Sequence, residues 1–225
     1  MKHLNDYITE KLKINSKLKV YGVHPKNQGE LLDILMERLD KDRDADLNDI
    51  DVSEITDMTE LFYDLNPRNI KIDQWDVSNV KDMSAMFAEC IEFNCDLSNW
   101  DVKNVKKMYM MFTNCESFDS DLSHWNVSNC DNMGEMFFSC RNFKGKGLSN
   151  WDVSNVQNFS NAFYECDNFN EDLSNWDLKS AINTEYMFCG CIKLNCDFSH
   201  LKKNKIQRYK SMFTHCINIK FPDWY

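Results

Sequence analysis

Glycine, proline and basic side chains are scarce in this 225-residue sequence, which has six Gly, three Pro and 26 Lys or Arg against 36 Asp or Glu. The glycine-rich nonapeptide of calcium-binding β-rolls is absent, and so are a phosphate-binding loop, a nucleophile elbow and a dinucleotide fingerprint. The five histidines are scattered and form no catalytic constellation. The formal charge of −10 would repel a phosphate backbone. We therefore expect neither an enzyme nor a nucleic-acid-binding protein, and no cofactor.

Long apolar runs are also missing. No stretch approaches the length of a membrane span. Residues 1–18 alternate polar and apolar side chains and include Asp6 and Glu10, so they lack the apolar core of a signal peptide. We expect the chain, as written, to stay in a reducing cytoplasm, with a secreted parent protein as the alternative.

A tandem repeat organises most of the sequence. Trp75, Trp100, Trp125, Trp151 and Trp176 are spaced by 25, 25, 26 and 25 residues, and an aliphatic residue continues the series at Ile50 and Leu201. This periodicity predicts an α/β repeat solenoid of seven coils over residues 47–225, starting near 50, 75, 100, 125, 151, 176 and 201. The one extra residue lies within 144–147, where two glycines can absorb a bulge.

Each coil is expected to contain two short parallel strands and a short helix. A Val or Leu stands two residues after the Trp position in most coils, as Val77 does after Trp75, which indicates one strand. A second strand is predicted from the alternation at 93–97. Between them, four apolar residues stand at i, i+3, i+4 and i+7, which is one face of a two-turn helix: Met83, Met86, Phe87 and Cys90. Asp or Asn precedes this set in most coils, with Glu60 and Glu135 completing predicted capping boxes.

The two ends depart from the repeat. Residues 1–46 predict an N-terminal helical cap with helices near 4–12 and 30–39, the second having five apolar residues on one side: Leu31, Leu32, Leu35, Met36 and Leu39. At the other end, basic residues replace the usual Asp, Val and Asn, and we expect this charge to blunt the terminal edge. These residues are Lys202, Lys203, Lys205, Arg208 and Lys210.

The phrases at 75–80 (WDVSNV), 82–87 (DMSAMF) and 93–98 (FNCDLS) resemble the Mycoplasma-type lipoprotein repeat family, which is grouped with BspA-like leucine-rich repeat surface proteins. The match covers residues 47–225, and a dozen positions recur in most coils. The resemblance implies a right-handed solenoid akin to leucine-rich repeats, from bacterial surface proteins and viral genomes, generally without a defined activity. It makes a cell-surface or virion location an alternative to the cytoplasm, although this chain shows no lipobox cysteine at its start.

Four residue ladders have both a structural and a functional interpretation. Six cysteines at one repeat position favour a row of buried free thiols over disulfides or a metal site, because no zinc-type spacing accompanies them: Cys90, Cys115, Cys140, Cys166, Cys191 and Cys216. The Trp series favours core packing over the stacking of sugar rings. The Asn series, beginning at Asn79 and Asn104, favours hydrogen bonds from the side-chain amides to backbone groups at the turn. Two rows of Asp favour turn capping, and calcium binding stays open.

We expect a protein-interaction scaffold whose partner is not specified by the sequence. Self-association as a structural component of a surface or virion, and carbohydrate adhesion, are the alternatives. Two surfaces are candidates for the partner. One is the outer side of the predicted helices, which carries variable aromatic residues: Tyr109, Phe138, Tyr164 and Tyr186. The other is the strand side, because residues 47–200 hold 11 basic against 26 acidic side chains and would attract a basic partner.

Overall fold

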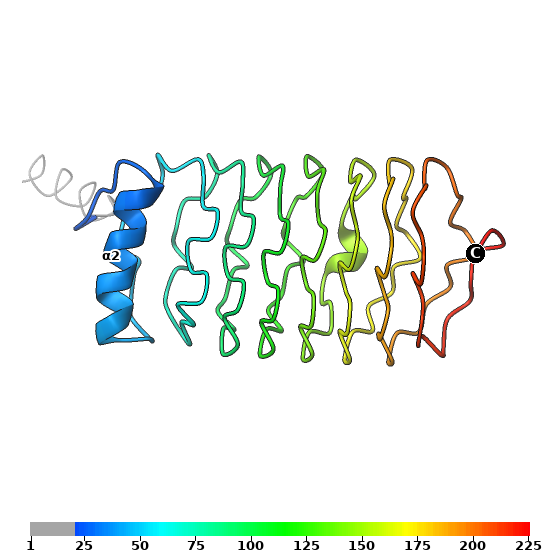
Figure 1. Cartoon of the computed structure of the whole chain (residues 1–225). Coiled ribbons are helices and arrows are strands. Elements are labelled where there is room, and N and C mark those ends of the chain that lie inside the picture. The colour runs from blue at the N-terminus through cyan, green and yellow to red at the C-terminus, as the bar shows by residue number, and fades with distance from the viewer. Residues whose placement is uncertain (1–20) are drawn as a thin grey trace, which may run out of the picture.

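The computed structural model describes residues 21–225, in which one α-helix is followed by successive coils of chain lying side by side along one axis (Figure 1). The helix, α2, lies at one end of this stack and the C-terminus at the other. The helix expected near residues 4–12 lies outside the described residues. The described chain has one further helical element, the short 3-10 helix η1 (Leu148–Asn150).

The helix α2 (Gln28–Lys41) confirms the helix expected at 30–39. The Asn27 side chain accepts a hydrogen bond from the Glu30 amide at 3.0 Å, which satisfies one of the free donors of the first turn. Leu31, Leu35 and Leu39 form its buried face. The expected five-residue apolar side is wrong in part, because Leu32 is only partly buried and Met36 is 51% exposed.

Successive coils are joined in parallel and in register with the repeat. Seven equivalent residues, one in each coil, form a continuous series of parallel bridges: Asp57, Asp82, Lys107, Asn132, Asn158, Asn183 and Arg208. Within residues 21–225 these bridges are isolated, so the two strands expected in each coil are not present as multi-residue strands. The coils are instead held together by side-chain packing and by a ladder of amides in another layer.

We call that layer the turn layer. It comprises residues 58–65, 83–90, 108–115, 133–140, 159–166, 184–191 and 209–216, where the sequence predicted a helix in each coil. The helix prediction is wrong: these residues form consecutive turns. Amides at the first, third, fifth and seventh positions donate to carbonyls of the next coil, as Ala85 does to Tyr109 at 2.7 Å. Amides at the fourth, sixth and eighth positions close turns within the coil, as Met86 does to Met83.

The third and seventh residues of the turn layer adopt left-handed backbone conformations, such as Ala85 (φ 53°) and Glu89 (φ 64°). A residue with a Cβ pays roughly 1–2 kcal/mol for this conformation. Each of these two residues also donates its amide to the next coil, a bond that contributes about 1 kcal/mol. The expected capping residues act on turns instead: the Asp82 carboxylate accepts from the amide of Ser84, two residues on.

The extra residue of the fourth coil is absorbed where the sequence places its glycines. Gly145 and Gly147 have φ of 89° and 93°, and η1 follows directly. A Cβ on Gly147 would stand 2.4 Å from the backbone of Ser123 in the preceding coil. Only glycine therefore allows the two coils to stay in contact at this point.

Aromatic rings stack along the axis of the core. Phe112, Phe137 and Phe163 occupy the same position in three coils, and their ring centroids are 5.6 and 5.4 Å apart. Each Trp donates its indole N–H to a carbonyl of the preceding coil, as Trp100 does to Ile72 at 3.0 Å. The core is therefore continuous from coil to coil, as the repeat requires.

Different segments cover the two ends of the stack. At α2, the Gln28 side chain donates to the Thr59 carbonyl of the first coil at 2.8 Å. At the other end, the last five residues return over the final coil: Phe221 and Tyr225 contact Phe213, and Trp224 contacts Tyr209. Aromatic packing, besides the expected basic charge, thus covers part of the terminal edge.

Candidate functional site

The thiol ladder is buried, as the sequence indicated. All ten cysteines are free and buried, and each of the six ladder thiols donates to the carbonyl of a Phe in the preceding coil at 2.9–3.0 Å. Burial raises the pKa of Cys90 to about 12 and that of Cys140 well above its ordinary value. Neutral thiols in this setting are packing groups with a weak hydrogen bond, and they are poor nucleophiles.

The Trp ladder is also buried in the core. Its five members are 2–4% exposed, and two neighbouring pairs have nearly parallel rings, Trp75 with Trp100 at 6.4 Å and Trp125 with Trp151 at 6.3 Å. Their N–H groups are already bonded to backbone carbonyls. These rings have no free face on which a sugar could stack.

The Asn and Asp rows bond to turns of the backbone. The Asn104 side chain donates to the Ser78 carbonyl at 2.8 Å, and Asn79, Asn129 and Asn155 repeat this bond. Seven of the eight expected Asp residues accept an amide from two residues on: Asp76, Asp101, Asp152, Asp96, Asp121, Asp172 and Asp197. The bond from Ser98 lowers the pKa of Asp96. The bonds from Ser199, together with Lys220, lower the pKa of Asp197 to about 2.

The four aromatic residues expected to bind a partner all lie on the outer side of the turn layer and are half-buried. The structure brings three of them together. Phe138 and Tyr164 stack at 4.9 Å with nearly parallel planes, and Tyr186 meets Tyr164 edge-on at 6.5 Å. We call Phe138, Tyr164 and Tyr186 the aromatic row. Tyr109 stands apart in the preceding coil, where its hydroxyl donates to Glu135 at 3.1 Å.

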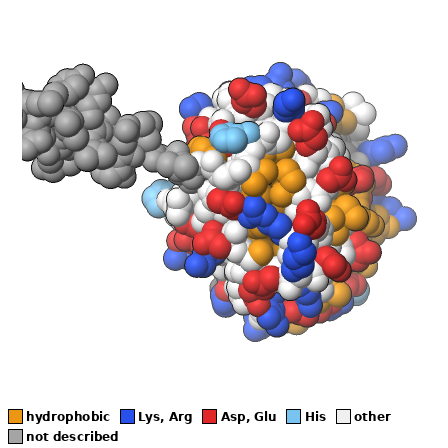
Figure 2. Space-filling view, turned by 90° about the vertical axis from the view of Figure 1, so that its left-hand side faces the viewer, with side chains coloured by type: hydrophobic (Ala, Val, Ile, Leu, Met, Phe, Trp, Pro, Cys, Tyr) orange, Lys and Arg blue, Asp and Glu red, His pale blue; other side chains and the backbone are white. Residues whose placement is uncertain are grey.

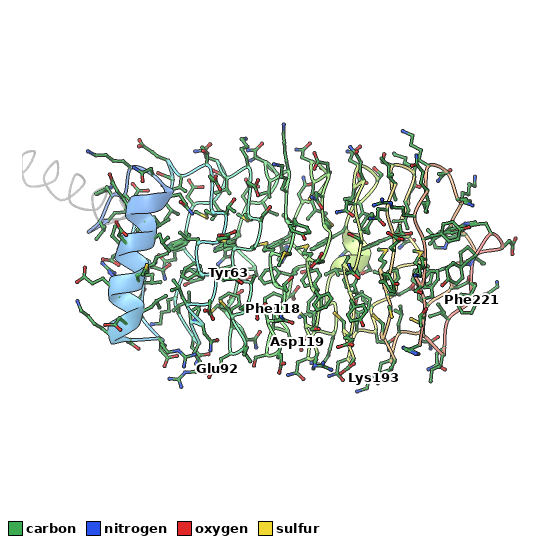
Figure 3. All side chains as sticks on the ribbon, viewed as in Figure 1. Tyr63, Glu92, Phe118, Asp119, Lys193 and Phe221 are labelled. Atoms are coloured by element: carbon green, nitrogen blue, oxygen red, sulfur yellow. The ribbon has the colours of Figure 1, made fainter. Side chains whose placement is uncertain are left out.

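Phe138 and Tyr164 project because large rings stand where the preceding coils carry small side chains. Phe138 and Tyr164 occupy the sixth position of the layer, where the coils before them carry Ala88 and Thr113, which are 0% and 4% exposed. Phe138 and Tyr164 therefore stand higher than the surface of the two preceding coils, where the side chains at this position are small. Tyr63 has the same sixth position in the first coil and is 45% exposed, far from the row. Figure 3 shows Tyr63 toward the α2 end of the stack.

Acidic side chains lie beside Tyr164 of the row and beside Tyr109. Glu165 is the first cause of the raised pKa of Tyr164. Burial and then Glu135 raise the pKa of Tyr109. The Tyr164 shift indicates negative charge next to this ring, part of which is balanced by Arg141, whose guanidinium pairs with Glu165 at 3.0 Å.

Sequence reasoning missed an apolar surface at the far end of the chain. Ile217, Phe221 and Tyr225 are 77%, 45% and 43% exposed. The signal was present in the sequence as three aromatic residues among 221–225, outside the repeat pattern. Figure 3 places Phe221 at the end of the stack opposite α2.

Two further searches bear on the site. Among residues 21–225, no group of three or more His, Cys, Asp or Glu side chains has a geometry that could hold a metal ion. The described part of the chain also contains no helix long and apolar enough to span a membrane.

Comparison with known proteins gives one family. Its model, described as "Mycoplasma protein of unknown function, DUF285", matches the chain over residues 35–147 and again over 122–224. No curated protein and no solved structure matches significantly. Since the two matches together extend over most of the sequence, the chain belongs to the DUF285 family of Mycoplasma proteins.

Proposed function

We propose that this protein is a non-catalytic interaction scaffold that binds a basic protein partner through the aromatic row. The observation that carries this role is the contact of Phe138, Tyr164 and Tyr186, three half-exposed rings from successive coils in one continuous surface. Aromatic residues are enriched among the side chains that dominate binding energy at protein interfaces. Glu135, in the same turn as Phe138, and the net charge of −15 over residues 47–200 complement a basic partner and add salt dependence.

The architecture that we propose for this role is a repeat solenoid akin to the leucine-rich repeats of BspA-like surface proteins, with a right-handed coil. The register of the parallel bridges and the stacked aromatic core support a solenoid. The turn layer differs from a helical one, so the likeness to leucine-rich repeats lies in the stacking of coils. Ten free thiols support residence in a reducing compartment.

The test compares two position-matched variants. Phe138→Thr/Tyr164→Thr removes two rings of the row, and Tyr63→Thr removes one exposed ring at the same repeat position in the first coil. Threonine is chosen because it occurs naturally at this position as Thr113 and Thr214. Both variants should keep the native fold by circular dichroism.

The partner is first captured from source cells with the wild-type protein, purified, and titrated against each variant. We expect the double variant to bind about tenfold or more weakly, since each lost aromatic contact at an interface contributes about 1–2 kcal/mol. Tyr63→Thr should bind as the wild type does. Equal affinity of the double variant and the wild type would move the site away from the row.

A further inference from the structure

The C-terminal end of the stack has unpaired hydrogen-bond donors. In every earlier coil, the first, third, fifth and seventh amides of the turn layer donate to the next coil. In the last coil, Tyr209, Ser211 and His215 occupy three of these positions, and their amides have no partner within residues 21–225. The fourth, Phe213, donates to the Tyr225 hydroxyl at a long 3.4 Å. Exposed amides of this kind favour an approaching acceptor.

This end is also basic. Residues 201–225 contain six Lys or Arg and a single Asp, whereas the coils over residues 47–200 have a net charge of −15. Lys202, Lys205, Arg208 and Lys210 are exposed. Ile217, Phe221 and Tyr225 are exposed in the same part of the chain, and the Phe221 and Tyr225 rings stack at 5.7 Å.

The opposite end of the stack, formed by α2, exposes acidic and apolar side chains. On α2, Asp33, Met36, Glu37 and Asp40 are all exposed. Residues 28–46 hold seven acidic against three basic side chains. Figure 2 shows hydrophobic side chains gathered in the middle of this end with charged ones around them. A shallow hollow between α2 and the first coil is lined by apolar residues such as Met36 and Leu65, and by three carboxylates and one guanidinium: Glu37, Asp40, Asp64 and Arg43.

We propose that the C-terminal end of one copy of this chain docks on the α2 end of a second copy. Residues 28–46 and 201–225 have net charges of −4 and +5, and both ends expose apolar side chains that such a contact would cover. Unpaired amides at one end would meet carboxylates at the other, namely Asp33 and Asp40. The chain already satisfies a coil edge with a helix side chain, since Gln28 of α2 donates to the Thr59 carbonyl.

The geometry of this contact sets the form of the assembly. Joining two C-terminal ends would place like charges together, which is unfavourable. Joining unlike ends is a heterologous contact, which leaves one free end of each kind and so extends into a linear chain. Such assembly is independent of the aromatic row, which lies on the side of the stack. The chain could therefore assemble even if the aromatic row binds no partner, and the row could bind a partner even if the chain does not assemble.

The first experiment is analytical ultracentrifugation of the full-length protein across a wide range of concentration. We expect the mean sedimentation coefficient to rise with concentration at about 0.05 M salt and this rise to be largely lost at about 0.5 M, where charge is strongly screened. A wild-type protein that sediments as a monomer at every concentration would overturn the proposal.

Charge reversal at each end then identifies the surfaces. Asp33→Lys/Asp40→Lys changes the net charge of residues 28–46 from −4 to 0, and Lys205→Glu/Lys210→Glu changes that of residues 201–225 from +5 to +1. None of these four side chains forms an ion pair among the described residues, so folding should be preserved. We expect each variant alone to be monomeric. An equimolar mixture should associate again into pairs through the one native end that each variant keeps, so that the mean mass rises toward twice that of the monomer.

The matched control reverses charge on the side of the stack. Glu116→Lys/Asp177→Lys changes the net charge by the same amount as the α2 variant, at two exposed residues of the middle coils. This control should associate like the wild type. Association of either end variant alone at wild-type strength, or a mixture that stays monomeric, would rule out the end-to-end contact.

Discussion

A middle coil and the last coil contain the same eight-residue turn layer, at 133–140 and 209–216, in different surroundings. In the middle, Phe137 stacks on an equivalent ring on either side, and the amide of Glu135 donates to the next coil at 2.8 Å. At the end, Phe213 has one equivalent neighbour, and the amide of Ser211 has no partner in the described chain. The comparison teaches that a coil's stability lies mainly in its two interfaces, as expected for a one-dimensional repeat.

The largest effect that we expect comes from the thiol ladder at alkaline pH. A thiol that is buried in the folded protein has a raised pKa, so the unfolded chain loses its proton first. Stability is then complete below about pH 8.5, the unfolded-state value, and is lost as pH rises toward the folded-state pKa, about 12 for Cys216. Each thiol contributes up to about 1.4 kcal/mol per pH unit in this interval.

Urea unfolding between about pH 7 and 10 measures this loss. The six ladder thiols titrate together, so the midpoint should fall steeply above about pH 8.5. Cys140→Ala should reduce the slope, since it removes one titrating group from the middle of the ladder. A midpoint that does not change with pH would contradict the burial of the ladder.

The next effect compares core rings in the two coils. Phe137→Ala should lower the free energy of unfolding by about 3–5 kcal/mol, because it opens a cavity between two interfaces. Phe213→Ala should cost less, since it disturbs one coil interface and the aromatic cover over it. Urea denaturation followed by tryptophan fluorescence checks both values, and a larger loss for Phe213→Ala would reverse the comparison.

A smaller effect is expected from the indole hydrogen bonds. Trp125→Phe leaves the carbonyl of Leu97 without its indole donor in a buried place, which should cost about 1–3 kcal/mol. Trp224→Phe removes the equivalent bond to Leu201, which is part-buried and close to solvent, and should cost about half as much or less. Thermal unfolding gives both values, and equal losses would mean that the terminal edge is as well covered as the core.

The smallest effect should come from the Asn ladder. Asn129→Ala removes one side-chain bond to the Lys103 carbonyl at an exposed turn. We expect a loss of about 0.5–1 kcal/mol, because water can replace the lost donor. The last coil carries Lys205 at this position, so Lys205→Asn in the same measurement should change stability by less than about 0.5 kcal/mol.

The sequence predicted the buried positions of this fold more accurately than its local backbone. Periodicity alone indicated burial of Trp100, Cys115 and their equivalents, because burial follows from the repeat. It failed for the turn layer, where two successive turns bury the first, fourth, fifth and eighth residues. This is the same i, i+3, i+4, i+7 spacing as a helix, and the left-handed residues that distinguish the two include Ala85 and Met110, which carry no sequence signal for it.

The candidate site was predicted in part for a similar reason. The four aromatic residues were identified because they vary between coils, and the structure finds all four on the outer side of the turn layer. Which of them touch could not be predicted, since Tyr109 and Phe138 stand at different turn positions and a helix would have placed them differently. The apolar C-terminal end depends on the return of residues 221–225 over the last coil, a contact outside the repeat pattern.

Amide hydrogen exchange, resolved by residue, tests most directly that the coils are held together by bonds between turn layers. Ala85, Met110, Glu135, Asn161, Tyr186 and Ser211 share the third position of the layer, and all but Ser211 donate to the following coil. We expect strong protection at Glu135, with Ser211 exchanging at nearly the rate of an unstructured peptide under dilute, high-salt conditions. Equal protection at Ser211 and Glu135 would contradict this account of the stack.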